Sequence, residues 1–196
     1  MNAIAELASL QWEQQEHDDI AHRDILALSV QDRVKHMVLH FAKYSGHLAA
    51  LTETRSTDKL ISTLVDTFII CLACANALQF KLGELVNNSS VALVDLGPSN
   101  NPVDVGSKML LRLAPATGSM AKACESLDHF ERVDYHVILE SGLVQVTSQC
   151  LAAANKLNLD LFAHSRARWR AVERKWTQNR SGTTKGSEAI RLAAKA

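Results

Sequence analysis

Residues 59–82 read KLISTLVDTFIICLACANALQFKL and are apolar on every side for most of their length. Their one acid, Asp66, stands in the middle. A helix that is apolar all round belongs in a core rather than on a surface, and polar residues interrupt this one too often for a membrane span. The stretch therefore predicts the central helix of an all-α bundle.

A second copy of this region follows 79 residues later without a gap. Apolar matches arise easily between two amphipathic helices, whereas matched polar residues do not. The matched polar pairs are Lys43 with Lys122, Cys71 with Cys150 and Asn76 with Asn155. We therefore expect two tandem helical hairpins, with the helices of Cys71 and Cys150 packed as a pseudo-two-fold core. Because residues 67–75 are apolar on more sides than one partner would cover, we also expect a homodimer.

The composition narrows the class of protein. Hydrophobic residues make up 47% of the 196 residues, and only 3 Pro and 8 Gly interrupt them, which favours an all-α fold. The formal net charge is zero, which gives no support for a nucleic-acid or membrane partner. The first residues hold no basic region followed by an apolar run, so we expect no secretory signal and a cytoplasmic protein. Cys71 and Cys74 lie within an apolar helix, which favours core cysteines over a redox or zinc motif.

Turn residues divide the chain into segments. They are an N-terminal helix or arm (1–28), a first hairpin (29–83), a connector (84–106), a second hairpin with its terminal helix (107–180) and a basic tail (181–196). Ser29 is the expected N-cap of the first hairpin, and Ser56 or Thr57 that of its second helix. The second hairpin should hold helices at about 117–129 and 133–157, with a break at Asn158. Residues 91–96 could form a short strand or an extended arm.

The first hairpin carries the residues most suited to chemistry. One stripe of its first helix holds His36, His40, Lys43, Tyr44 and His47. Thr63 and Asp66 lie one turn apart on the opposite helix, and such facing pairs build metal sites in helical bundles. His40, His47 and Asp66 form a set that suits Zn²⁺, Mn²⁺ or Fe²⁺. The alternative is that these imidazoles hydrogen-bond within a buried polar seam around Asp66.

Two further charged groups allow other interpretations. Glu125 and Asp128, with Glu140 on the next helix, could form a carboxylate cluster or a solvated face. A basic face near the end of the chain could bind phosphate, or it could be a solvated end or an anchor for an acidic partner. Its residues are Arg166, Arg170, Arg174, Lys175, Asn179 and Arg180.

The segments AKYSGHLAAL (42–51), STLVDTFI (62–69) and ANALQFKL (75–82) resemble the MazG-like all-α nucleotide pyrophosphohydrolases. That superfamily also holds the dimeric dUTPases and the phosphoribosyl-ATP pyrophosphohydrolases. The segment from residue 153 to 179, with Lys175 and Asn179, resembles the family's closing segment. The resemblance covers about residues 30–82 and 115–180. It implies a nucleoside triphosphate substrate, and Mg²⁺ held by four acids that activates water for pyrophosphate release.

Carried over residue by residue, the resemblance gives an incomplete acid set. The four acid positions hold Tyr44, His47, Thr63 and Asp66 in the first half, and Ala123, Ser126, Gly142 and Gln145 in the second. The implied site assigns Asp66 and His47 to catalysis, and Asp66, His47 and His40 to a metal. It assigns substrate phosphates to Lys175, Asn179, Arg180, Lys43 and Tyr44. Two functions follow as hypotheses: a nucleotide-binding pyrophosphohydrolase relative, or a non-catalytic oligomerisation or partner-binding protein with the same fold.

Overall fold

The computed structural model describes residues 3–89 and 96–176, and within them it contains helices and no strand. The helices are α1 (Ala3–Ala21), α2 (Arg23–Leu26), α3 (Val30–Thr54), α4 (Thr57–Leu78), α5 (Leu82–Asn88), α6 (Pro102–Asp128), α7 (Tyr135–Lys156) and a last described helix over residues 161–176. The all-α class predicted from the sequence is confirmed.

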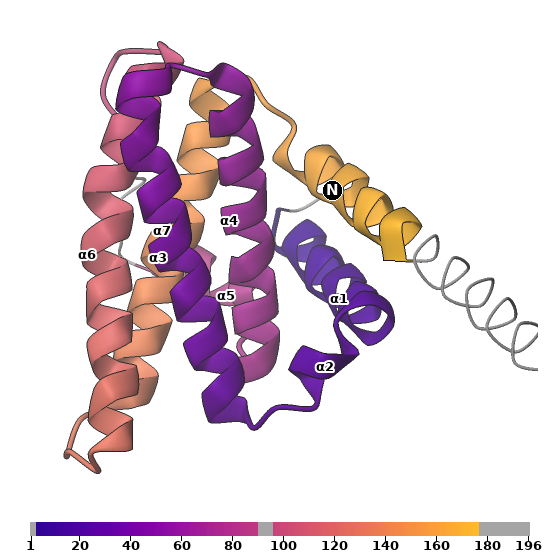
Figure 1. Cartoon of the computed structure of the whole chain (residues 1–196), viewed down its shortest axis with the longest axis vertical. Helices are drawn as coiled ribbons and strands as arrows, with labels where there is room; N and C mark the ends of the chain where they lie inside the picture. The colour runs from indigo at the N-terminus through magenta and orange to yellow at the C-terminus, as the bar shows by residue number, and fades with distance from the viewer. Residues whose placement is uncertain (1–2, 90–95, 177–196) are drawn as a thin grey trace, which may run out of the picture.

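The long helices α3, α4, α6 and α7 form an upright bundle (Figure 1). α3 packs against α4 and α6, and α7 packs against the same two helices from the other side. The core between them includes Phe41, Leu64, Phe68, Leu72 and Leu143, each with no exposed surface. Burial of each such side chain contributes roughly 1.5–3 kcal/mol. α1 and helix 161–176 lie outside this bundle, on the side of α4 (Figure 1).

Side-chain caps fix where several helices begin. Ser29 and Ser56, both predicted as caps, each accept a hydrogen bond from the backbone N–H three residues later. Asn158 has a φ of 50° and ends α7, as expected for a residue that tolerates the left-handed region. The cap positions predicted from the sequence are therefore confirmed for the first hairpin.

The connector between the hairpins is shorter than predicted. α5 and the start of α6 occupy much of residues 84–106. α6 begins at Pro102 rather than near Thr117, because the Asn101 side chain accepts a hydrogen bond from the N–H of Val103 and Pro102 fits the first helical turn. Pro115 lies inside α6, where packing of its neighbours against the core offsets the missing hydrogen bond. The strand or arm expected at 91–96 falls almost wholly outside the described residues.

The apolar circumference of α4 is covered by its own chain. α3 and α7 cover two sides, and α1 covers another. Cys71 and Cys150 are both fully buried, and α4 packs against α7, so these two helices pack together as predicted. The internal repeat itself stays a prediction. The apolar sides that suggested a homodimer are thus filled within one chain.

α4 and α7 are long and apolar enough to cross a membrane. Their most apolar windows are 67% and 56% buried inside the bundle, as core helices also are. The length and composition of these two helices are therefore only weak evidence that the protein spans a membrane.

Candidate functional site

A cavity of about 240 Å³ lies between the bundle and the two helices outside it. Its wall is built from α1, α2, α3, α4 and helix 161–176. α4 contributes an apolar surface with Ile69, Ile70 and Ala73, whereas α3 contributes mostly polar side chains. The cavity therefore has one apolar and one polar side.

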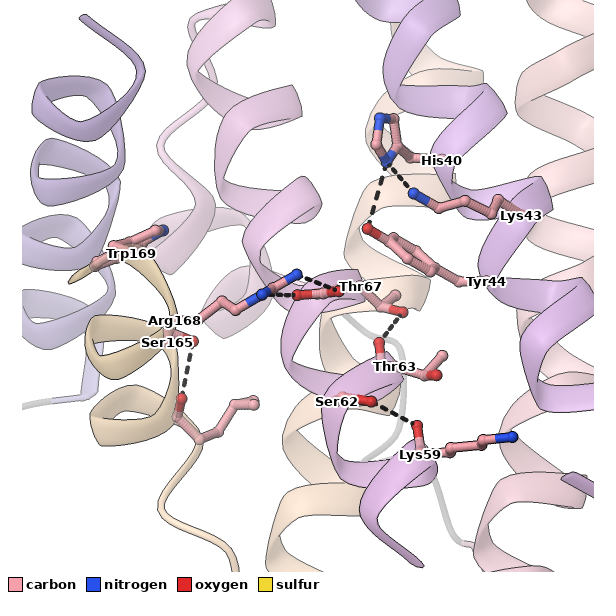
Figure 2. A network of polar contacts seen from close by, with 12 residues as sticks. His40, Lys43, Tyr44, Lys59, Ser62, Thr63, Thr67, Ser165, Arg168 and Trp169 are labelled. Atoms are coloured by element: carbon pink, nitrogen blue, oxygen red, sulfur yellow. Dashed lines mark hydrogen bonds and ion pairs between the residues drawn. The ribbon is translucent and has the colours of Figure 1, made fainter. Parts of the chain in front are cut away.

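The polar side is the stripe of α3 predicted from the sequence. His40 Nε2 lies 3.1 Å from His36 Nε2, and His40 Nδ1 lies 3.0 Å from Lys43 Nζ and 3.3 Å from the Tyr44 hydroxyl. Figure 2 shows the last two contacts converging on the His40 ring. The Lys43 ammonium also lies 4.5 Å from the centre of the Tyr44 ring, a cation–π contact. Four residues of the stripe, His36, His40, Lys43 and Tyr44, therefore form one hydrogen-bonded network.

Burial is the main reason that His40 stays neutral. Burial, with smaller contributions from the nearby Lys43 and His36, lowers the pKa of His40 to about 4. Burial likewise raises the pKa of the Tyr44 phenol, with a further contribution from the Asp66 carboxylate. At neutral pH, this side of the cavity therefore offers a neutral imidazole and a phenol as hydrogen-bonding groups.

Asp66, the acid in the middle of α4, forms a two-armed ion pair with Arg168. Arg168 Nε donates to Oδ1 at 2.8 Å, and its Nη2 donates to Oδ2 at 3.2 Å. Figure 2 shows Arg168 reaching from helix 161–176 toward α4. Both oxygens of Asp66 therefore already have a cationic partner, and such forked pairs are strong and directional.

The fold does not bring together the three metal ligands predicted from the sequence, His40, His47 and Asp66. His47 is exposed and does not line the cavity. Its ring lies edge to face with the Tyr44 ring, with 5.9 Å between the ring centres. Asp66 pairs with Arg168, and His40 bonds within the α3 stripe. The alternative interpretation is that the imidazoles hydrogen-bond within a polar seam. His36 and His40 fit that description, because they hydrogen-bond to each other.

The predicted phosphate-binding residues do not all lie at one site. Lys43 and Tyr44 line the cavity, whereas Lys175 is exposed and does not. Asn179 and Arg180 lie outside the described residues. Arg166, on the same helix, is paired with Glu13 on α1 through two hydrogen bonds of 2.7 Å.

The acids of the second hairpin form surface ion pairs. Glu125 pairs with Lys122 at 3.2 Å, and Asp128 pairs with Lys35 and accepts a hydrogen bond from Gln31 at 2.8 Å. Exposed pairs of this kind contribute little to stability and are typical of a solvated helix face. This arrangement favours the solvated face over a carboxylate cluster.

Arg33 is a cavity residue that the sequence analysis missed. Its Nε atom is buried and has no hydrogen-bond partner in the described part of the chain. A buried donor without a partner costs free energy, roughly 1–3 kcal/mol for neutral groups and more for charged ones. Arg33, Lys43 and Arg168 give the cavity three formal cations against the carboxylates of Asp18 and Asp66.

A second group that the sequence analysis missed lies where α1 turns into α2. His17, Asp18 and His22 each place one donor atom within 4.8 Å of the others, and in the described part of the chain they are the one group of three His, Cys, Asp or Glu residues to do so. All three line the cavity. The spacing of Asp18 and His22, four residues apart, is the sequence signal that could have found them.

The Mg²⁺ site implied by the MazG-like resemblance does not fit the residues present. Of its four positions only Asp66 is an acid, and that acid is held by Arg168. Mg²⁺ requires several oxygen ligands in near-octahedral geometry, which Tyr44, His47 and Thr63 do not provide. No protein-family model, curated protein or solved structure matches this chain.

Proposed function

We propose that the protein binds a nucleotide or a closely similar phosphate-bearing small molecule in this cavity. The observation that carries the proposal is the buried Nε of Arg33, a cavity residue, which has no hydrogen-bond partner among residues 3–89 and 96–176. A phosphate oxygen would satisfy it, because guanidinium and phosphate form strong charge-assisted hydrogen bonds. Lys43, which is exposed at the same wall, would supply a second cation.

The opposite side of the cavity suits a flat, weakly polar group. Ile69, Ile70 and Ala73 of α4 provide apolar surface, and the Trp169 ring adds an aromatic face. Small-molecule sites commonly combine such apolar walls with a few fixed polar groups. At about 240 Å³ the cavity would hold only part of a nucleoside triphosphate. We therefore expect the rest of the ligand to extend toward solvent along Lys43.

Binding is proposed here rather than pyrophosphate release through Asp66 and His47. Asp66 already has a cationic partner in Arg168, and His47 is exposed and does not line the cavity. The alternative from the sequence is a non-catalytic oligomerisation or partner-binding protein that keeps the same fold.

The proposal is tested by thermal shift and calorimetry with ATP, dNTPs, pyrophosphate and inorganic phosphate, because a ligand that binds only the native state raises Tm. Arg33→Gln and Lys43→Ala should each weaken binding about 10-fold or more, as expected for lost charge-assisted contacts. Lys175→Ala is the matched control, since Lys175 is an exposed lysine that does not line the cavity.

Two results would count against the proposal. The first is wild-type protein that none of these ligands stabilises or binds. The second is binding that Lys175→Ala weakens while Arg33→Gln and Lys43→Ala leave it intact, which would place the ligand on the basic end of the chain.

A further inference from the structure

The end of α1 brings three metal-ligating side chains together. The N–H of His22 donates to the Asp18 carbonyl at 2.9 Å, the bond of a last helical turn, so Asp18 and His22 lie one turn apart on the same face. The His17 and His22 rings meet edge to face, with 5.4 Å between their centres. We propose that His17, Asp18 and His22 form a binding site for a transition-metal ion, with Zn²⁺ as the best-suited ion.

The spacing of the donors is close to what a metal requires. The three donor atoms lie within 4.8 Å of one another. In a tetrahedral site with bonds of about 2.1 Å, donors stand roughly 3.4 Å apart. Small rotations of the side chains would therefore close the site, without movement of the backbone.

Glu173 holds the His17 ring in the orientation that a metal ligand needs. Its carboxylate lies 2.8 Å from His17 Nδ1, across the contact between helix 161–176 and α1. A ring that donates from Nδ1 to a carboxylate keeps the lone pair of Nε2 free for a metal. Carboxylate–histidine contacts of this kind fix the tautomer at metal sites and raise the basicity of the ligand.

A second chain of hydrogen bonds holds Asp18. The Trp169 indole N–H donates to Gln14 Oε1 at 2.8 Å, and Gln14 Nε2 donates to Asp18 Oδ1 at 2.8 Å. All three side chains are buried. Within the described residues no hydrogen bond reaches Asp18 Oδ2, so this oxygen is available to a cation. Two of the three proposed ligands are thus positioned by residues from helix 161–176.

The burial of Asp18 also calls for a cation. The residue is 8% exposed, and it makes no salt bridge among residues 3–89 and 96–176. Buried carboxylates are usually paired with a cation or coordinate a metal, because removal from water is costly. A divalent ion between Asp18 and the two imidazoles would supply that partner.

The donor set selects the class of ion. Two imidazoles and one carboxylate suit Zn²⁺, Fe²⁺ or Mn²⁺, whereas Mg²⁺ prefers oxygen ligands throughout. Three protein ligands leave one tetrahedral position open. Since His17, Asp18 and His22 all line the cavity, the open position would face it. The inference stands apart from the nucleotide proposal, because it concerns binding of the metal alone.

The test is a metal titration of the full-length, tag-free protein after EDTA treatment and dialysis, with no nucleotide present. Zn²⁺ affinity is measured by competition with a chromophoric chelator, and Co²⁺ reports coordination through its visible absorption. We expect one Zn²⁺ per chain. His22→Ala and Asp18→Asn should weaken Zn²⁺ binding more than about 100-fold, and Glu173→Gln should weaken it about 10–100-fold.

His47→Ala is the matched control, because His47 is an exposed histidine far from the cluster in sequence and does not line the cavity. It should keep wild-type affinity. Far-UV circular dichroism and melting in EDTA establish that each variant is folded, and the half-buried His22 is the position least disturbed by truncation. Wild-type protein that binds no stoichiometric Zn²⁺, or His22→Ala and Asp18→Asn proteins that bind it as wild type does, would overturn the inference. An equal loss of Zn²⁺ affinity in His47→Ala would also overturn the inference.

Discussion

Replacing His40 with glutamine should make the protein more resistant to mild acid. In the folded state burial, Lys43 and His36 lower the pKa of His40 from 6.5 to about 4, with Asp66 and His22 as its other charged or titratable neighbours. Above pH 6.5 the imidazole is neutral in both states, so it has no effect. As the pH falls below 6.5 the unfolded chain takes up a proton that the folded chain refuses, and stability falls until about pH 4.

The size of this effect follows from the burial of the ring. A fall in pKa from 6.5 to about 4 corresponds to at most roughly 3.4 kcal/mol, at about 1.36 kcal/mol per tenfold change in proton affinity. His40 is only half-buried, so water screens part of its charge, and we expect about half of that limit, roughly 1.5–2 kcal/mol. For a chain of this length this is about 3–8 °C in Tm.

The assay is thermal and urea unfolding followed by circular dichroism at intervals from pH 7.5 to pH 4.5. The wild type should lose more stability than His40→Gln over this range, and His47→Gln, which replaces an exposed imidazole, should behave as wild type. Inorganic phosphate bound near Lys43 should narrow the gap, since an anion favours the protonated ring. Parallel pH profiles for wild type and His40→Gln would refute the reasoning.

Three further perturbations test the packing around the cavity. A double-mutant cycle with Asp66→Asn and Arg168→Gln should give a coupling of about 1 kcal/mol, measured by urea unfolding, because the pair is forked but partly exposed. Trp169→Phe should cost about 1–3 kcal/mol in the same assay, since the buried Gln14 Oε1 loses its donor. Gly83→Ala should lower Tm by several degrees, about 1–3 kcal/mol, because its new Cβ would lie 2.9 Å from a backbone oxygen of α1. If a variant kept wild-type stability, the contact that it removes, or the clash that it adds, would not have the energetic effect expected here.

The fold was predictable where local signals and core periodicity agree. α4 is apolar all round, and its cap Ser56 precedes it directly, so both its place and its start follow from the sequence. The start of α6 was missed for a local reason. Asn101 and Pro102 are typical of turns, but they also suit the N-cap and the first residue of a helix. The packing of α6 against α3 selects the helical arrangement.

The site was harder to predict because its parts are far apart in sequence. Arg168 lies 102 residues from Asp66, and Glu173 lies 156 residues from His17. Helical periodicity places residues on a face of one helix, and it correctly grouped His36, His40 and Tyr44. It does not indicate which cation or carboxylate a distant helix will bring to that face, so Asp66 was assigned to a metal when its partner is a guanidinium.

The pairing of Asp66 with Arg168 bears on the Mg²⁺ site that the MazG-like resemblance implies. Several carboxylates close together repel one another unless a cation lies among them. This chain has no acid at positions 44, 47 and 63, so Asp66 needs only one positive charge. Arg168 supplies this charge from the chain itself, at 2.8 Å. On this argument the guanidinium takes the place of a divalent cation, and restoring acids at those positions without removing Arg168 would not restore an Mg²⁺ site.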